Sequence, residues 1–173
     1  MPVLRRVFAA AVLAVGLAIS AAPALADGPD KVFEKTTVWR MLSPDAKLVV
    51  YGIDDPVVEG VACHYTLPYI GGYKGMFGLA EEVSDVSLAC RQTGPISFKE
   101  KFSQGDEVFS QRRSMIFKRM QIVRGCDEKR NVLVYLVYSD RVIEGSPKNS
   151  TSSVPIMPWG GAGATPRCAD FID

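Results

Sequence analysis

Beyond its first 26 residues, the chain alternates between apolar and polar positions with the period of β-strands. Within residues 84–91, Val86, Leu88 and Cys90 share one face while polar side chains occupy the other. Residues 32–42, 47–53 and 57–66 are also predicted strands, because β-branched and aromatic residues recur in them. Turn-forming residues at 54–56 and 93–95 should end strands there.

The second half of the chain predicts a hairpin. Residues 107–124 mix β-formers with basic side chains, and we expect one strand there rather than the helix that Lys, Arg, Gln and Met also tolerate. Residues 132–138 are apolar at every position, which is typical of a strand buried on both faces. The polar residues 127–131 between them suit a tight connection. The pattern therefore predicts a mainly β protein: a single antiparallel domain, sandwich or open barrel, with residues 132–138 central and at most one or two short helices, one candidate being 79–83.

The first 26 residues have the layout of a secretory signal peptide. Arg5 and Arg6 form a basic start, residues 7–22 carry no charge, and Ala24-Leu25-Ala26 is an A-x-A cleavage sequence before Asp27. The apolar run is shorter than the roughly 20 residues that span a bilayer. We expect a cleaved signal and an exported product. General secretion is favoured, although the arginine pair also fits twin-arginine export.

Composition narrows the class of protein. The chain has 20 Lys+Arg against 19 Asp+Glu, and removal of Arg5 and Arg6 leaves 18 against 19. This balance argues against a nucleic-acid partner. Because no second apolar run approaches spanning length, we do not expect an integral membrane protein. With one histidine, His64, zinc sites that need several imidazoles are excluded.

The four cysteines all follow the predicted cleavage site, which favours disulfides in an oxidising compartment. Cys63 and Cys90 lie on the apolar faces of predicted strands, so we expect a Cys63–Cys90 bridge and, with it, Cys126–Cys168. A four-thiolate zinc site is the rival, but it lacks any C-x2-C pair. If the second bridge anchors only a polar tail, Cys63→Ala should lower thermal stability more than Cys168→Ala.

No motif of catalysis or cofactor binding stands out. The glycines at 72, 75 and 78 do not form a nucleotide-binding loop. His64 has no G-x-S-x-G or S-x-x-K companion and should be exposed on the polar strand face. The acid pairs Asp54-Asp55 and Glu81-Glu82 sit at element ends, where such residues are ordinary. We therefore predict no enzyme, no catalytic residues, no metal site and no cofactor.

Two charged regions are candidates for binding. Residues 112–130 hold seven basic side chains against two acidic ones, which reads either as a face for an anionic ligand, partner or lipid headgroup, or as a solvated hairpin balanced within the fold. The loop after the apolar strand could present a contact surface, or its polar side chains could bond their own backbone. Its candidate partner-binding residues are Ser139, Asp140, Arg141, Glu144, Lys148 and Asn149.

Three segments carry a family resemblance: GLAEEVSDVSLACRQTGPI at 78–96, DEKRN at 127–131 and YSDRVIEGSPKNSTSSVPIMPW at 138–159. Together they resemble the CreA family of bacterial periplasmic proteins, over about residues 32–159. The resemblance implies a small exported protein linked to carbon-source and envelope-stress responses, with no established reaction. The tail and Cys126 go beyond the family's core, which agrees with a second bridge.

The chain is therefore divided into a signal peptide (1–26), a CreA-like β domain (27–159) and a Gly/Ala-rich tail held by a disulfide (160–173). We expect a periplasmic binding or regulatory module whose partner is a periplasmic protein or a small anionic ligand. The alternatives are a periplasmic hydrolase with an unrecognised site, or a structural envelope component that would show an exposed apolar patch.

Overall fold

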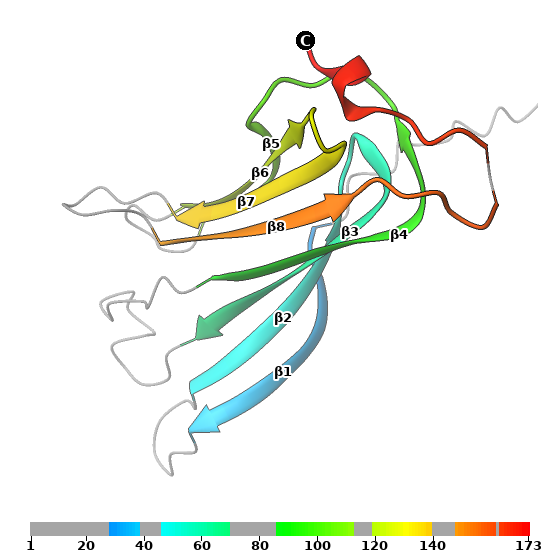
Figure 1. Cartoon of the computed structure of the whole chain (residues 1–173). Helices are drawn as coiled ribbons and strands as arrows, with labels where there is room; N and C mark the ends of the chain where they lie inside the picture. The colour runs from blue at the N-terminus through cyan, green and yellow to red at the C-terminus, as the bar shows by residue number, and fades with distance from the viewer. Residues whose placement is uncertain (1–27, 39–45, 70–85, 113–118, 140–147, 162) are drawn as a thin grey trace, which may run out of the picture.

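The structure is a computed structural model that describes residues 28–38, 46–69, 86–112, 119–139, 148–161 and 163–173. The predicted signal peptide and the predicted helical turn at 79–83 lie outside these residues. The described chain forms two antiparallel sheets of four strands each (Figure 1). The first has the order β1-β2-β3-β4: β1 (Asp30–Val38), β2 (Ala46–Asp54), β3 (Val58–Tyr69) and β4 (Ser87–Phe98). The second has the order β5-β6-β7-β8: β5 (Asp106–Arg112), β6 (Arg119–Asp127), β7 (Val132–Ser139) and β8 (Asn149–Pro155).

The predicted fold class is confirmed: the protein is mainly β and antiparallel, and it has two sheets that share one core. Alternate residues of β3, including Val61, Cys63, Tyr65 and Leu67, are buried, as alternation requires of a strand with one face on a core. They form one cluster with inward residues of the second sheet: Met120, Ile122, Leu133, Tyr135, Val137 and Val154. A 3-10 helix, η1 (Cys168–Phe171), is the one helical element among the described residues.

The two sheets meet along the edge strands β4 and β8, which lie side by side in Figure 1. Side chains, rather than a backbone ladder, join these edges. The backbone N–H of Cys90 donates to Ser152 Oγ at 2.8 Å. The amide of Gln92 pairs with Met157 in both directions, donating to its carbonyl at 2.9 Å and accepting from its N–H at 3.0 Å. These bonds satisfy edge groups that would otherwise be open to another strand.

A buried ion pair crosses the core between the sheets. Asp55 lies between β2 and β3, and its Oδ1 accepts from the Arg124 guanidinium of β6 at 2.5 Å. The Asp55 side chain is 0% exposed and the Arg124 side chain 2%. Asp55 also accepts from the Tyr135 hydroxyl at 2.8 Å and from the backbone N–H groups of Val57 and Val58. The carboxylate therefore has charged and neutral donors from both sheets.

Two strand predictions need correction. Residues 107–124 were expected to form one strand, but they contribute to both β5 and β6, which pair antiparallel with each other. The apolar strand β7 is central in its sheet, as predicted, yet it is buried on one face only. Its outward residues Val132, Val134, Leu136 and Tyr138 are half-buried. The apolar run at 132–138 therefore predicted burial of both faces, whereas the structure buries only the face toward the core.

The predicted break at 93–95 is also wrong, because β4 continues through it to Phe98. As an edge strand, β4 tolerates Pro95, whose missing N–H costs no ladder bond there. Opposite it, β3 has a bulge at Gly60, with φ of +78°. A Cβ at Gly60 would stand 2.4 Å from the Pro95 carbonyl oxygen, so only glycine allows this close approach.

Both predicted disulfides are present. Cys63 and Cys90 face each other in register on β3 and β4, with Cα atoms 4.0 Å apart. Cys126 of β6 is joined to Cys168 of η1. The Asn131 amide adds to this second link, because it accepts from the Cys168 N–H at 2.9 Å and donates to the Pro166 carbonyl at 3.0 Å.

The premise that the second bridge holds only a polar tail is wrong. Phe171 stacks on Phe98 with ring centroids 4.3 Å apart. The backbones of Ile172 and Phe102 pair in an isolated parallel β-bridge. Phe171 and Ile172 both pack against the core cluster. The tail is thus part of the packed structure, and the expected ranking of the two bridges changes with it.

We predict that Gly60→Ala will strongly destabilise the fold, by more than about 2 kcal/mol, because it combines left-handed backbone strain with a clash against backbone. Gly94→Ala is the matched control. A Cβ there would meet only the Gly60 Cα at 3.7 Å, an ordinary contact. Urea unfolding of both variants measures the difference, and equal midpoints would contradict this reading of the bulge.

For the disulfides, we now expect loss of Cys126–Cys168 to cost at least as much stability as loss of Cys63–Cys90. Their sequence separations of 42 and 27 residues correspond to about 4 and about 3.5 kcal/mol of unfolded-state entropy. Loss of the longer bridge also loosens the packing of Phe171. Thermal unfolding of the paired Cys→Ala variants tests this, and a clearly larger loss for Cys63/Cys90 would restore the original ranking.

Candidate functional site

A surface groove of about 470 Å³ crosses one end of the first sheet and reaches the start of β8. Its floor is built from cross-strand neighbours on three strands. Leu48 of β2 lies opposite Pro68 of β3, and Thr66 of β3 lies opposite Ser87 of β4. These side chains point away from the core, since their chain neighbours Val49, Leu67 and Leu88 are the buried ones. We call this site the outer groove; it is lined by Leu48, Thr66, Pro68, Val86, Ser87, Lys148 and Asn149.

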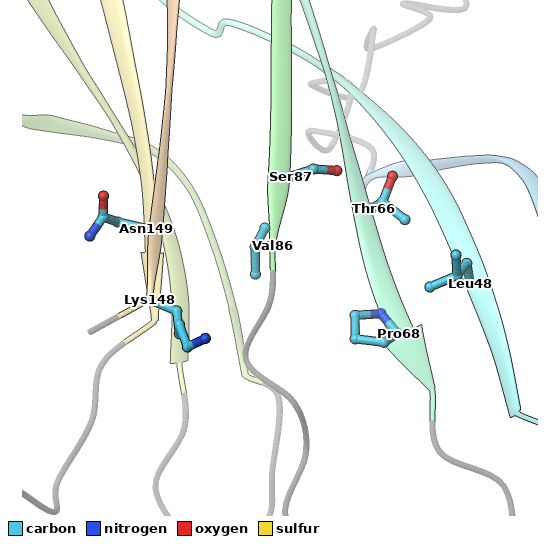
Figure 2. A pocket seen from close by; sticks show the side chains of 7 residues that line it. All are labelled: Leu48, Thr66, Pro68, Val86, Ser87, Lys148 and Asn149. Atoms are coloured by element: carbon cyan, nitrogen blue, oxygen red, sulfur yellow. The ribbon is translucent and has the colours of Figure 1, made fainter. Parts of the chain in front are cut away.

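Lys148 supplies the positive charge of the outer groove. Figure 2 shows its ammonium group directed from the start of β8 toward β4, whereas the amide of Asn149 points away from β4. The backbone places Lys148 firmly, because its carbonyl accepts from the Ser139 N–H at 3.3 Å. The arrangement brings one cation beside an apolar floor with two hydroxyl groups, Thr66 and Ser87. Such a site can hold a small molecule that has an apolar part and a negative charge.

Two of the six predicted contact residues, Lys148 and Asn149, therefore line the outer groove. Ser139 differs from them: it ends β7, is only 7% exposed, and supports the backbone at Lys148 rather than presenting a surface. Asp140, Arg141 and Glu144 lie outside the described residues.

The basic character predicted for residues 112–130 is reduced by pairing. Arg124 is buried against Asp55 and also stacks over the Phe102 ring, 4.4 Å from its centroid. Arg130 pairs with Asp127 at 2.7 Å, and its hydrogen bond holds the pKa of that carboxyl below its usual value. Lys129 and Arg119 are exposed, while Arg113 and Lys118 lie outside the described residues. In the described part, the hairpin is closer to the balanced alternative.

His64 is exposed on the outer face of the first sheet, as predicted, with its ring over Gly52. The two acids of the 54–55 pair separate. Asp54 is exposed, while Asp55 is the buried anchor of the inter-sheet network. Burial first, and then the Asp55 carboxylate, raise the pKa of the Tyr135 hydroxyl far above its ordinary value, so that it stays a neutral donor. The pair Glu81-Glu82 lies outside the described residues.

A second, smaller hollow of about 320 Å³ lies over β6 and β7, where Val123, Val134 and Leu136 give it an apolar wall. Gln104 also lines it, and its side chain pairs with Cys126, donating to its carbonyl at 2.9 Å and accepting from its N–H at 2.8 Å. Gln104 precedes β5, and its side chain thus bonds the backbone of β6 beyond the last residue pair of the β5–β6 ladder. The Gln104 hydrogen bonds satisfy the backbone of Cys126, so Gln104 has a structural role in this hollow.

The groove floor was missed at the sequence level. Leu48, Thr66 and Ser87 were predicted only as strand residues, and Pro68 lay beyond the predicted end of its strand at residue 66. Their proximity depends on register across three strands, which the pattern of one strand does not give. Within the described residues no group of three or more His, Cys, Asp or Glu side chains could hold a metal ion.

Fold, disulfides and groove together define a disulfide-bonded antiparallel β protein. Residues 32–159 match the family model described as CreA protein. The chain belongs to the CreA family. It is 50% identical over 127 residues to Protein CreA of Escherichia coli strain K12, a match that covers 71% of this chain and 81% of that protein. The same values hold for Protein CreA of E. coli O6:H1 and of E. coli O157:H7. No solved structure matches the chain.

Among the described residues, no helix has the length and apolar character needed to cross a membrane.

Proposed function

We propose that this protein is an exported binding module of the bacterial periplasm. Two observations support export. The sequence begins with a basic, apolar and A-x-A pattern. The structure has two disulfides and no free cysteine among the described residues. Disulfides of this kind persist in oxidising compartments.

Export predicts a mature protein that begins at Asp27 and carries both bridges. Mass spectrometry of the protein from the periplasmic fraction of a bacterial host should show loss of residues 1–26 and a mass four hydrogens below the reduced form. Retention of the first 26 residues would contradict a cleaved signal peptide. Free thiols in periplasmic material would contradict the two disulfides.

The outer groove is the proposed binding site, and the ligand is a small anion with an apolar part. The observation that carries this proposal is the combination of Lys148 with the apolar side chains of Leu48, Pro68 and Val86 in one hollow. An ammonium group beside apolar walls attracts a negative charge more strongly than the same group in open water, because the local dielectric is lower. The proposal assigns binding and no catalytic step.

Octanoate tests the groove, because it joins a carboxylate to a short alkyl chain. We expect it to shift the backbone amide signals of Thr66, Ser87 and Asn149 in two-dimensional NMR spectra. Lys148→Gln should weaken octanoate binding by up to about fivefold, the upper value for one exposed ion pair. It should leave the weaker binding of the uncharged octanamide unchanged.

Lys129→Gln is the matched control, since it removes an exposed lysine from the β6–β7 turn, away from the groove. The groove proposal fails if octanoate moves no groove signals, or if Lys129→Gln weakens binding as much as Lys148→Gln does.

A further inference from the structure

Strand β1 is oriented with its apolar side chains away from the core. Glu34 lies opposite Val49, which is buried, so Glu34 is on the inner side of the first sheet. Phe33 and Lys35 lie opposite Val50 and Leu48, which point outward. Val32 is also outward, since its Cγ2 would stand 3.6 Å from a Cβ at Gly52, on the same face as the His64 ring. This is the reverse of the polarity expected for a strand of a two-sheet protein.

The outward side chains form what we call the apolar strip: Val32, Phe33, Leu48 and Val50. Val32 is 53% exposed, Phe33 57% and Leu48 39%, and these are three of the five exposed large apolar residues of the described chain. Figure 1 shows β1 on the side of the first sheet farthest from β5–β8. Exposed apolar groups gathered on one face, instead of scattered singly, indicate a contact surface.

The charges around the strip are unevenly placed. Lys35 shares the outward face and lies opposite Leu48. Lys148, in the outer groove, flanks the same end. The outward acids Asp30 and Asp54 lie at the other end of the sheet, opposite Gly52 and Ala62, where Arg91 also lies opposite Ala62. The strip is therefore flanked by lysines at the end where Leu48 is exposed.

The lysines on the other face of the same strands are already paired. Lys31 and Lys47 both donate to Glu34, at 2.7 and 2.9 Å, and these hydrogen bonds lower the pKa of Glu34 to about 2. The Lys35 side chain has no ion pair or hydrogen bond with any described residue. Among the lysines of β1 and β2, Lys35 is thus the one whose charge is available to a partner.

We propose that the apolar strip and Lys35 form a docking surface for an anionic lipid bilayer, with Phe33 entering the headgroup region and Lys35 facing lipid phosphates. Surface binding of this kind needs a few apolar side chains that insert shallowly and nearby cations that meet anionic lipids. A stable protein interface needs about 1,000 Å² of complementary area, whereas the strip is four side chains on the exposed margin of one sheet. Asp30 and Asp54 lie at the Val32 end of the strip, where they would repel anionic lipid, so the Phe33 and Lys35 end should approach the bilayer first.

Co-sedimentation with vesicles tests this surface, using the mature protein with both disulfides intact. We expect binding to vesicles of equimolar phosphatidylglycerol and phosphatidylcholine and little binding to phosphatidylcholine alone. Phe33→Ser should weaken binding about tenfold or more, and Lys35→Gln about fivefold. Because both side chains are exposed, the variants should keep the wild-type unfolding midpoint.

Lys31→Gln is the matched control. It removes the same charge from the same strand, but from the opposite face, and should leave binding unchanged. The proposal is overturned if the wild type binds neither kind of vesicle, which would leave an acidic protein as the partner of the strip. It is equally overturned if Lys31→Gln weakens binding as much as Lys35→Gln does. Neither result bears on octanoate in the outer groove, because neither Phe33 nor Lys35 lines it.

Discussion

The buried pair of Asp55 and Arg124 is the interaction on which the arrangement of the two sheets depends. Each charge comes from a different sheet, and each would be left uncompensated in the core without the other. Tyr135 adds a neutral donor from β7, and Val57 and Val58 add backbone donors from β3 and the turn before it. The sheets can therefore close in few relative positions, because any shift that separates these groups leaves a charge buried alone.

This constraint also determines which surfaces are left for binding. The inward faces are committed to the core, to Cys63–Cys90 and to the ion pair, and the β4–β8 edges are joined by Ser152 and Gln92. In the described chain, the outward face of the first sheet takes part in none of these contacts. It carries the floor of the outer groove and the apolar strip, which share Leu48. We propose that the protein meets a small anion and a lipid surface on this one face.

Local patterns predicted what depends on neighbouring residues, and they failed where distant contacts decide. Alternation placed Cys63 and Cys90 on one face, and their register then joined them. Residues 113–118 contain no glycine, proline, asparagine or aspartate, so nothing signalled the division between β5 and β6. Asp55 read as an ordinary turn acid because its partner Arg124 is 69 residues away. The inverted face of β1 was hidden for a related reason: alternation shows that a strand has two faces, but not which one meets the core.

A double-mutant cycle on Asp55→Asn and Arg124→Met tests the central role of the ion pair most directly. Each single variant should lose about 3–5 kcal/mol of unfolding free energy, since it leaves one buried charge unpaired. The double variant should lose at least about 2 kcal/mol less than the two single losses combined. The same cycle on the exposed pair Asp127–Arg130 should give a coupling below about 1 kcal/mol. Additive losses at Asp55 and Arg124, or a coupling no larger than that of the exposed pair, would contradict the claim that this pair locks the two sheets together.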